Sequence, residues 1–158
     1  MILSIDPGVH ECGVAVWGTT AGLQRAYLCQ GLSTAMYAGA WSSMAGALGL
    51  SERDTSRVVI ELPQVYVRSR SKGDPNDLIQ LAACVGAIAQ AFRHVPVHIF
   101  KPSEWKGQVP KLVMIERIKE RLSPDESACV KLPKDKKFQT DVWDAVGLGL
   151  HYLKRLRG

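Results

Sequence analysis

The sequence contains no long hydrophobic run, and none of its apolar stretches approaches the ~18 residues that are needed to cross a bilayer. Its first residues, MILSIDPG, lack the charged region that precedes the apolar part of a secretory signal. Cysteines are few, and they lack the spacing of a zinc site or a disulfide framework (Cys12, Cys29, Cys84 and Cys129). We therefore expect a cytoplasmic protein with no membrane partner, whose cysteines are small core residues.

The sequence also shows no internal repeat and no sign of a second domain. The 158 residues are 46% hydrophobic and 22% charged, which excludes wholesale disorder. This length and composition predict a single domain over residues 1–158.

Positive charge is concentrated at one end of the chain. Residues 1–60 carry three basic and four acidic groups, whereas residues 101–158 carry thirteen and eight, and the whole chain has a net charge of +5. Many of the basic groups fall in two clusters (Lys131, Lys134, Lys136 and Lys137; Lys154, Arg155 and Arg157). This excess indicates a polyanionic partner, although a lysine-rich surface that only aids solubility is an alternative.

Apolar runs between turn residues predict an α/β fold, a mixed five-stranded β-sheet with helices on both faces. We expect strands over 2–5, 12–17, 22–30, 57–62 and 96–100, the first three forming an antiparallel meander. Three- and four-residue apolar spacing and composition predict helices over 34–48, 77–92, 111–122 and 140–156, the last capped by Thr140 or Asp141. The polar stretches 67–75 and 123–137 are expected to be loops.

Two carboxylates end apolar strands, where packing would favour Val or Ile. Asp6 ends the first strand, and an Asx-turn into Pro7-Gly8 is a structural alternative for it. Glu61 ends the run VVIEL, where a buried carboxylate needs a cationic partner. Parallel pairing of these two strands would bring both side chains together.

A second pair of carboxylates occupies the last predicted helix. Asp141 and Asp144 are three residues apart and project from the same face, and the following AVGLGL indicates that this helix is buried on one side. Helix capping could explain Asp141 alone, and it explains Asp144 less readily.

Four carboxylates brought together would repel one another strongly unless divalent cations neutralised them. Oxygen ligands select Mg²⁺ or Mn²⁺ over zinc. Two such ions can activate water and stabilise the leaving 3′ oxygen in phosphodiester hydrolysis. The acidic residues therefore predict a two-metal nuclease.

Three segments, in order along nearly the whole chain, resemble the first-strand, fourth-strand and last-helix motifs of the RuvC-type Holliday junction resolvases: SIDPGVHECGVAVW, IELPQVY and TDVWDAVGLGLHYL. This resemblance implies an RNase H-like fold and a homodimeric endonuclease of DNA recombination and repair. Such an enzyme resolves four-way junctions by paired symmetric nicks that leave 5′-phosphate and 3′-hydroxyl ends. The compact chain is similar to phage-type members, which implies the cytoplasm of a bacterial cell or a phage-infected host.

The same resemblance implies residue roles. The metal-binding and catalytic quartet would be Asp6, Glu61, Asp141 and Asp144, and the catalytic lysines would be Lys106 and Lys111, within EWKGQVPK. The short spacing between the two lysines leaves open which of them does what.

A basic loop after the fourth strand is a candidate DNA contact. Arg68, Arg70 and Lys72 would hold phosphates and help to open the junction, unless the loop is merely solvated. Tyr66 would stack on an unpaired base, or else it is a core tyrosine.

The predicted helix around residues 77–93 carries small residues that permit close helix approach (Ala82, Ala83, Gly86, Ala87 and Ala91). The resemblance implies that the homodimer forms through this helix, which would place two active sites across a two-fold junction. Packing of these residues on the sheet is the alternative.

Three other functions remain open. A non-cleaving branched-DNA-binding protein would lack metal-dependent nicking, and a broader flap or fork nuclease would use the same site. An actin-like ATPase or sugar kinase shares strand-Asp-x-Gly openings, but it needs two domains around a nucleotide, so we expect no nucleotide cofactor.

Overall fold

A computed structural model of the protein describes residues 1–30, 54–64 and 75–156. The described residues form five strands: β1 (Ile2–Asp6), β2 (Glu11–Trp17), β3 (Leu23–Gln30), β4 (Arg57–Glu61) and β5 (Val97–Phe100). The helices are α3 (Pro75–Ala91), α4 (Pro102–Trp105), α5 (Lys111–Glu120), α6 (Pro124–Ala128) and α7 (Gln139–Tyr152), with the 3-10 turn η2 (Lys136–Phe138). The helix predicted over 34–48 lies outside the described residues.

The strands form one mixed sheet in the order β3-β2-β1-β4-β5. The predicted antiparallel meander is confirmed, since β1 pairs with β2 and β2 with β3 in antiparallel fashion. Strand β4 joins β1 in parallel, with Ile5 opposite Ile60, and β5 continues in parallel beside β4. The carboxyl ends of β1 and β4 therefore meet at the same edge of the sheet.

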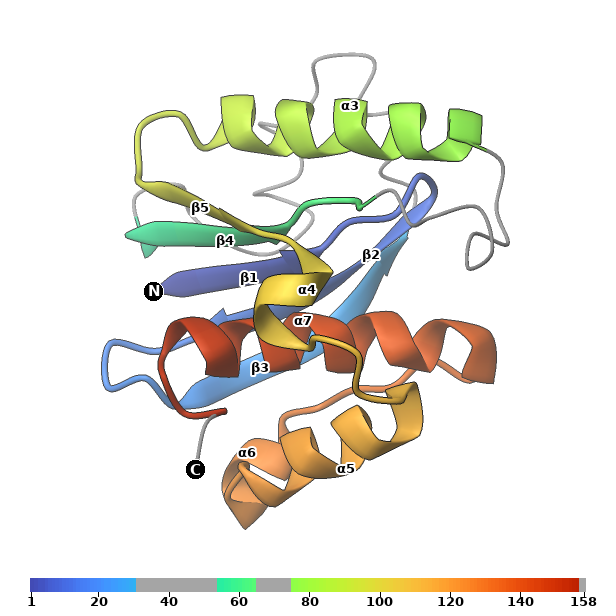
Figure 1. Cartoon of the computed structure of the whole chain (residues 1–158). Coiled ribbons are helices and arrows are strands. Elements are labelled where there is room, and N and C mark those ends of the chain that lie inside the picture. The colour runs from blue at the N-terminus through green and yellow to red at the C-terminus, as the bar shows by residue number, and fades with distance from the viewer. Residues whose placement is uncertain (31–53, 65–74, 157–158) are drawn as a thin grey trace.

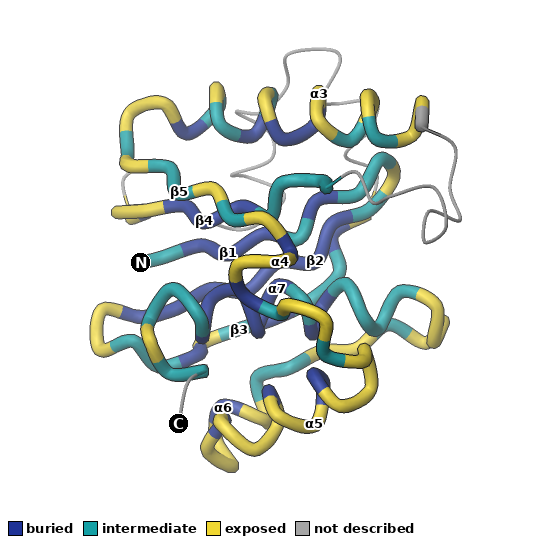
Figure 2. Tube along the Cα trace, in the orientation of Figure 1, coloured by how far each residue is buried: buried dark blue, intermediate teal, exposed yellow. Residues whose placement is uncertain are grey.

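Helices cover both faces of this sheet, which confirms the predicted fold class (Figure 1). Helix α3 packs on one face through Cys84, Val85 and Ile88, and Phe92, directly after the helix, packs in the same cluster. On the opposite face α7 lies across β1 and β2, and α5 packs outside it. Figure 2 shows the central strands and α7 as buried, whereas α5 and α6 are largely exposed. In the part of the chain described here, no helix is both long and apolar enough to cross a membrane.

The stretch 123–137 is not the continuous loop that its polarity predicts. Ser123 and Glu126 form a reciprocal capping box around Pro124, and this arrangement starts the short helix α6. The expected cap of the last helix was also wrong, because α7 begins at Gln139 and places Thr140 in its first turn. Side-chain capping was therefore underestimated at α6 and overestimated at α7, whose N-cap residue Phe138 makes no side-chain cap hydrogen bond.

Candidate active site

Asp6 and Glu61 project from the same face of the sheet. Side chains alternate along a strand, so Asp6 shares its face with Ser4, whose hydroxyl donates to the Ala145 carbonyl of α7 at 2.8 Å. In β4, Glu61 shares its face with Val59, which packs in the cluster beneath α7. The parallel register of β1 and β4 therefore sets the two carboxylates side by side, as the sequence predicts.

Small residues let α7 approach this face closely. A Cβ atom added to Gly13, which pairs with Asp6 across β1 and β2, would lie 1.8 Å from the Asp141 carbonyl oxygen. A Cβ on Gly149 would lie 2.2 Å from the indole nitrogen of Trp17. Only glycine fits at these contacts, and the close approach brings the first turns of α7, with Asp141 and Asp144, over the end of β1.

Lys106 links two of the carboxylates. Its ammonium lies 2.9 Å from Asp144 Oδ2 and 3.2 Å from Glu61 Oε2. Burial would lower the pKa of Lys106, but the charges of Glu61 and Asp144 outweigh burial and raise that pKa above its ordinary value. The lysine is therefore held protonated among the acids.

Trp105 is a site residue that the sequence reasoning missed. Its indole N–H donates to Glu61 Oε2 at 2.7 Å, and its ring is buried against the position of Gly147 in α7. The nearest sequence indication was the motif EWKG, in which only the lysine was singled out. Trp105 holds one oxygen of Glu61 in place while Lys106 contacts the same carboxyl group.

The site is short of positive charge. Burial raises the pKa of Asp6 well above its ordinary value, and the nearby charges of Glu61, Asp144 and Asp141 raise it further, against the opposing effect of Lys106. Burial also raises the pKa of Glu61, although Lys106 and Trp105 partly counter it. One ammonium therefore does not neutralise the gathered carboxylates.

Asp141 lies at the rim of this cluster. Burial raises its pKa, while the Thr140 hydroxyl, 3.2 Å from Oδ1, and the charge of Lys111 lower it. Lys111 is exposed at the start of α5. The structure thus places Lys106 between Glu61 and Asp144. Lys111 stays exposed outside this pair of contacts, and its charge acts on Asp141.

The donor set suits hard divalent ions. Among the described residues, however, no group of three or more His, Cys, Asp or Glu side chains is arranged so that it could hold a metal ion. In this conformation the Lys106 ammonium is paired with Glu61 and Asp144. The chemistry of the residues fits Mg²⁺ or Mn²⁺, because the donors are carboxylate oxygens whose mutual repulsion a dication would relieve.

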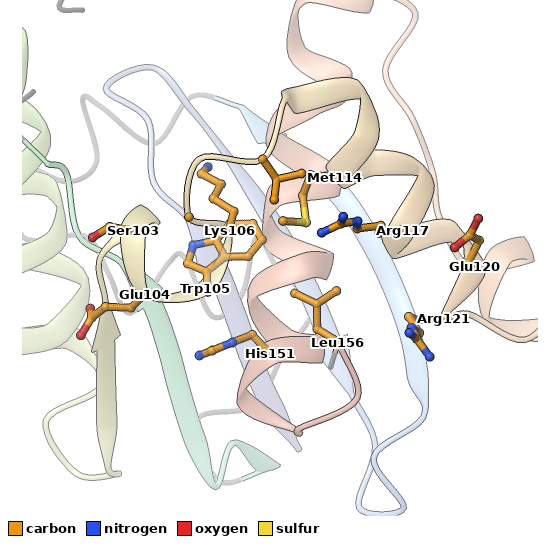
Figure 3. A pocket seen from close by; sticks show the side chains of 12 residues that line it. Ser103, Glu104, Trp105, Lys106, Met114, Arg117, Glu120, Arg121, His151 and Leu156 are labelled. Atoms are coloured by element: carbon orange, nitrogen blue, oxygen red, sulfur yellow. The ribbon is translucent and has the colours of Figure 1, made fainter. Parts of the chain in front are cut away.

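A cavity of about 650 Å³ adjoins the cluster and is lined by Trp105 and Lys106, but by none of the four carboxylates. In Figure 3, Trp105 and Lys106 lie over α7, and Arg117 and Arg121 extend from the side of α5. His151, farther along α7, packs edge-on against Phe100 with ring centroids 5.1 Å apart. The carboxylates are therefore beside this cavity rather than inside it.

The predicted DNA-contact residues Tyr66, Arg68, Arg70 and Lys72 lie outside the described residues. Their roles stay predictions. The described part of the chain brings Asp6, Glu61, Asp144 and Lys106 together, with Asp141 next to them and Lys111 nearby.

No protein-family model and no curated protein sequence matches this chain. Solved structures do match it. The chain is similar to RuvC of T. thermophilus in complex with a Holliday junction substrate, at 16% identity and a TM-score of 0.56, covering 99% of this chain and 95% of that one. A second Thermus thermophilus RuvC structure matches at 16% identity and a TM-score of 0.51, covering 96% and 92%.

The yeast mitochondrial Holliday junction resolvase is also similar, at 10% identity and a TM-score of 0.55, covering 98% of this chain and 79% of that one. At such low identity, these likenesses show the fold. The predicted resemblance to RuvC is therefore confirmed as a shared α/β, RNase H-like architecture over almost the whole chain.

Proposed function

We propose that this protein is a metal-dependent endonuclease that resolves four-way DNA junctions by paired symmetric nicks, leaving 5′-phosphate and 3′-hydroxyl ends. One observation carries the proposal. On a fold shared with two junction resolvases, four carboxylates and a protonated lysine gather where β1, β4 and α7 meet. A cluster of like charges destabilises the fold by repulsion, so its presence needs another explanation. Binding of the metal ions that assist phosphoryl chemistry on DNA would provide one.

The carboxylates would share the binding of two Mg²⁺ or Mn²⁺ ions. When bound, such ions supply an activated water and neutralise charge on the leaving 3′ oxygen. Asp6, whose pKa is raised by burial and by all three other acids, would contribute its carboxylate to both ions. Glu61 would bind one ion, while Asp141 and Asp144 would bind the other or orient the attacking water.

Lys106 would contact the DNA phosphate once metal ions bind Glu61 and Asp144. Its ammonium, now bound to Glu61 and Asp144, would be available to the charge that develops on the phosphate. Lys111 is exposed and faces Asp141, which suits a supporting contact to the DNA backbone. We therefore assign the main catalytic role to Lys106 and the smaller one to Lys111.

A symmetric dimer would match the two-fold symmetry of a four-way junction. The outer face of α3 suits such an interface, because Ile79 is 69% exposed and no atom of the described residues lies within 4 Å of a Cβ added to Gly86. Ala82 and Ala83 are exposed on the same helix. These features support dimerisation through the predicted helix 77–93.

Cleavage of an immobile four-way junction, beside linear duplex and flap controls, tests this function. We expect symmetric nicks on the junction alone with Mg²⁺ or Mn²⁺, and none with EDTA. Equal cutting of flaps and forks would replace the proposal with a broader branched-DNA nuclease. Tight binding without cutting in either metal would leave a non-cleaving junction-binding protein.

A further inference from the structure

The segment between α6 and α7 carries four lysines that the proposed chemistry does not use. Lys131, Lys134, Lys136 and Lys137 are all exposed, and Asp135 is the only acid among residues 131–138. We call these four lysines the basic strip. Figure 1 shows that this segment leads from α6 to the N-terminal end of α7.

The basic strip begins along the outer edge of the sheet. Val130 forms a parallel bridge with Ala26 of β3, and the Lys131 amide donates to the Ala26 carbonyl at 2.8 Å. Because the bridge is parallel, the segment proceeds toward the Gln30 end of β3. That end pairs with Glu11 of β2, on the side of the sheet where Asp6 lies. The strip therefore approaches the carboxylates from the β3 edge.

A hydrogen-bonded residue joins the strip to the site. The Thr140 hydroxyl lies 3.3 Å from the carbonyl oxygen of Lys137 and 3.2 Å from Asp141 Oδ1. Lys137 is four residues before Asp141, about one helical turn away. A phosphate bound at the end of the strip would thus be next to the proposed cleavage site.

The lysines of the strip are not neutralised within the described part of the chain. None of the four forms an ion pair with a described carboxylate. Asp135 accepts the backbone N–H of Lys137 at 2.9 Å and thereby caps η2. The exposed ammonium groups are therefore available to an external anion, and binding one would not require an existing ion pair to break.

The adjoining groove favours phosphates over stacked bases. It has a volume of about 540 Å³ and lies between β3 and the strip, with Tyr27 and Phe138 among its lining residues. Cations already lie over both rings, with Lys137 Nζ 4.9 Å from the Phe138 centroid and the Arg25 guanidinium 5.0 Å from that of Tyr27. These cations occupy ring faces on which a base would stack and add positive charge beside the strip.

We propose that the basic strip binds the phosphate backbone of a duplex arm of the branched DNA, on the β3 side of the carboxylate cluster. This inference rests on the proposed function and adds a second DNA contact to it. A duplex carries one negative charge per about 1.7 Å of its axis, so closely spaced lysines release counterions when they bind it. The strip thus orients an arm without reading its sequence.

The test compares two variants with equal loss of charge. The strip variant is Lys134→Gln/Lys136→Gln/Lys137→Gln. The matched control, Arg57→Gln/Arg93→Gln/Lys119→Gln, removes three exposed charges outside both basic clusters, and two of them lie near the opposite end of the sheet, where Arg57 pairs with Ile2. Affinity for a four-way junction and for linear duplex is measured in EDTA at several salt concentrations, together with a thermal melt of each variant.

In the strip variant, the negative slope of log K against log salt should become smaller in magnitude by about 2.7, at about 0.9 for each phosphate contact that is lost. Its affinity should fall of the order of 10²-fold at 0.1 M salt and converge with the wild type near 1 M. The control should keep the wild-type slope, and Lys134→Arg/Lys136→Arg/Lys137→Arg should bind as the wild type does.

An unchanged slope in the strip variant would overturn the inference, as would an equal loss of slope in the matched control. Failure of the proposed function looks different. If the wild type binds junctions through the strip but cuts nothing in either metal, the nuclease proposal falls and the strip stands. If the wild type binds no DNA at all, both fall.

Discussion

Two clusters of buried charge in this molecule are built on opposite principles. In α6, Glu126 is satisfied on both oxygens: Arg155 donates to each at 2.8 Å, and the Leu23 and Ser123 amides donate at 2.8 and 2.9 Å. These bonds lower the pKa of Glu126 to about 2. At the carboxyl ends of β1 and β4, several acids share one lysine, and burial raises the pKa of Asp6.

This difference separates a structural ion pair from a chemical site. The Glu126 pair ties α6 to the turn before β3 and to the end of the chain after α7, and it leaves no charge for a ligand. The Asp6 cluster keeps an excess of negative charge that the fold does not compensate. Perturbed carboxylates of the second kind are typical of functional sites.

Among the variants considered, Asp6→Asn should have a very large effect on the rate of DNA cleavage. We expect cleavage to fall at least ~10³-fold, because the variant loses a carboxylate that we propose as a ligand of both ions, while junction binding survives. In EDTA the variant should unfold at higher denaturant than the wild type, since one like charge is removed from the cluster. Junction nicking and urea unfolding measure the two effects. Wild-type cutting by this variant would remove Asp6 from the site.

Protonating Glu126 in acid should lower the free energy of unfolding, whereas removing the charge of Asp6 should raise it. Because the folded pKa is lowered, the stability from this group is fully present above its unfolded pKa, near 4.5, and is lost as pH falls toward about 2. We expect a loss of about 2–3 kcal/mol in the free energy of unfolding over that window, from about 1.4 kcal/mol per pKa unit. Urea unfolding at each pH measures this loss.

The Glu126→Gln variant is the control for that experiment. It should be less stable than the wild type at pH 7, and it should lack the part of the acid-dependent loss that belongs to this side chain. Identical pH profiles for the two proteins would show that the pair does not behave as a compensated structural bridge.

Trp105→Phe would remove the hydrogen bond that holds Glu61 in the carboxylate cluster. The variant keeps an aromatic ring near Gly147 but loses the N–H that holds Glu61, a hydrogen bond to a charged group worth about 1.5–3 kcal/mol. We expect cleavage to fall about tenfold or more, with DNA affinity unchanged. Trp17→Phe is the matched control, since it loses an indole bond to the neutral Ser4 hydroxyl and should affect stability rather than turnover.

Lys111→Gln should have the smallest effect. The side chain is exposed and acts on Asp141 only through space, so solvent screens its charge. A few-fold reduction in cleavage that disappears at high salt is expected, in contrast to a much larger loss for Lys106→Gln. Equal losses for the two variants would contradict the unequal roles proposed here.

Much of the fold was predictable because it depends on local patterning. Apolar runs and turn residues located the five strands, and apolar spacing located α3 and α5, close to their observed bounds. The capping box of α6 was readable in SPDE but was overlooked in a polar stretch. Asp6, Glu61 and Asp144 were identifiable because each breaks an apolar pattern at a strand end or on a buried helix, whereas Asp141 was identifiable only through its spacing from Asp144.

Trp105 was not identifiable in this way, because a tryptophan in EWKG is equally suited to a core. Its role depends on the 2.7 Å contact with Glu61, across 44 positions of the chain. The same holds for Thr140, which meets Lys137 and Asp141 only after α7 has begun at Gln139.

The sequence by itself determined the strands, the buried helices, the acidic residues and the excess of positive charge, because these follow from the periodicity and chemistry of neighbouring residues. Only the tertiary structure decided which charges are compensated. Glu126 and Asp6 are both carboxylates, yet one meets a guanidinium and two amides, and the other meets three further acids. Electrostatic environment depends on distances between segments remote in the chain, and the packing of α7 on the sheet sets those distances.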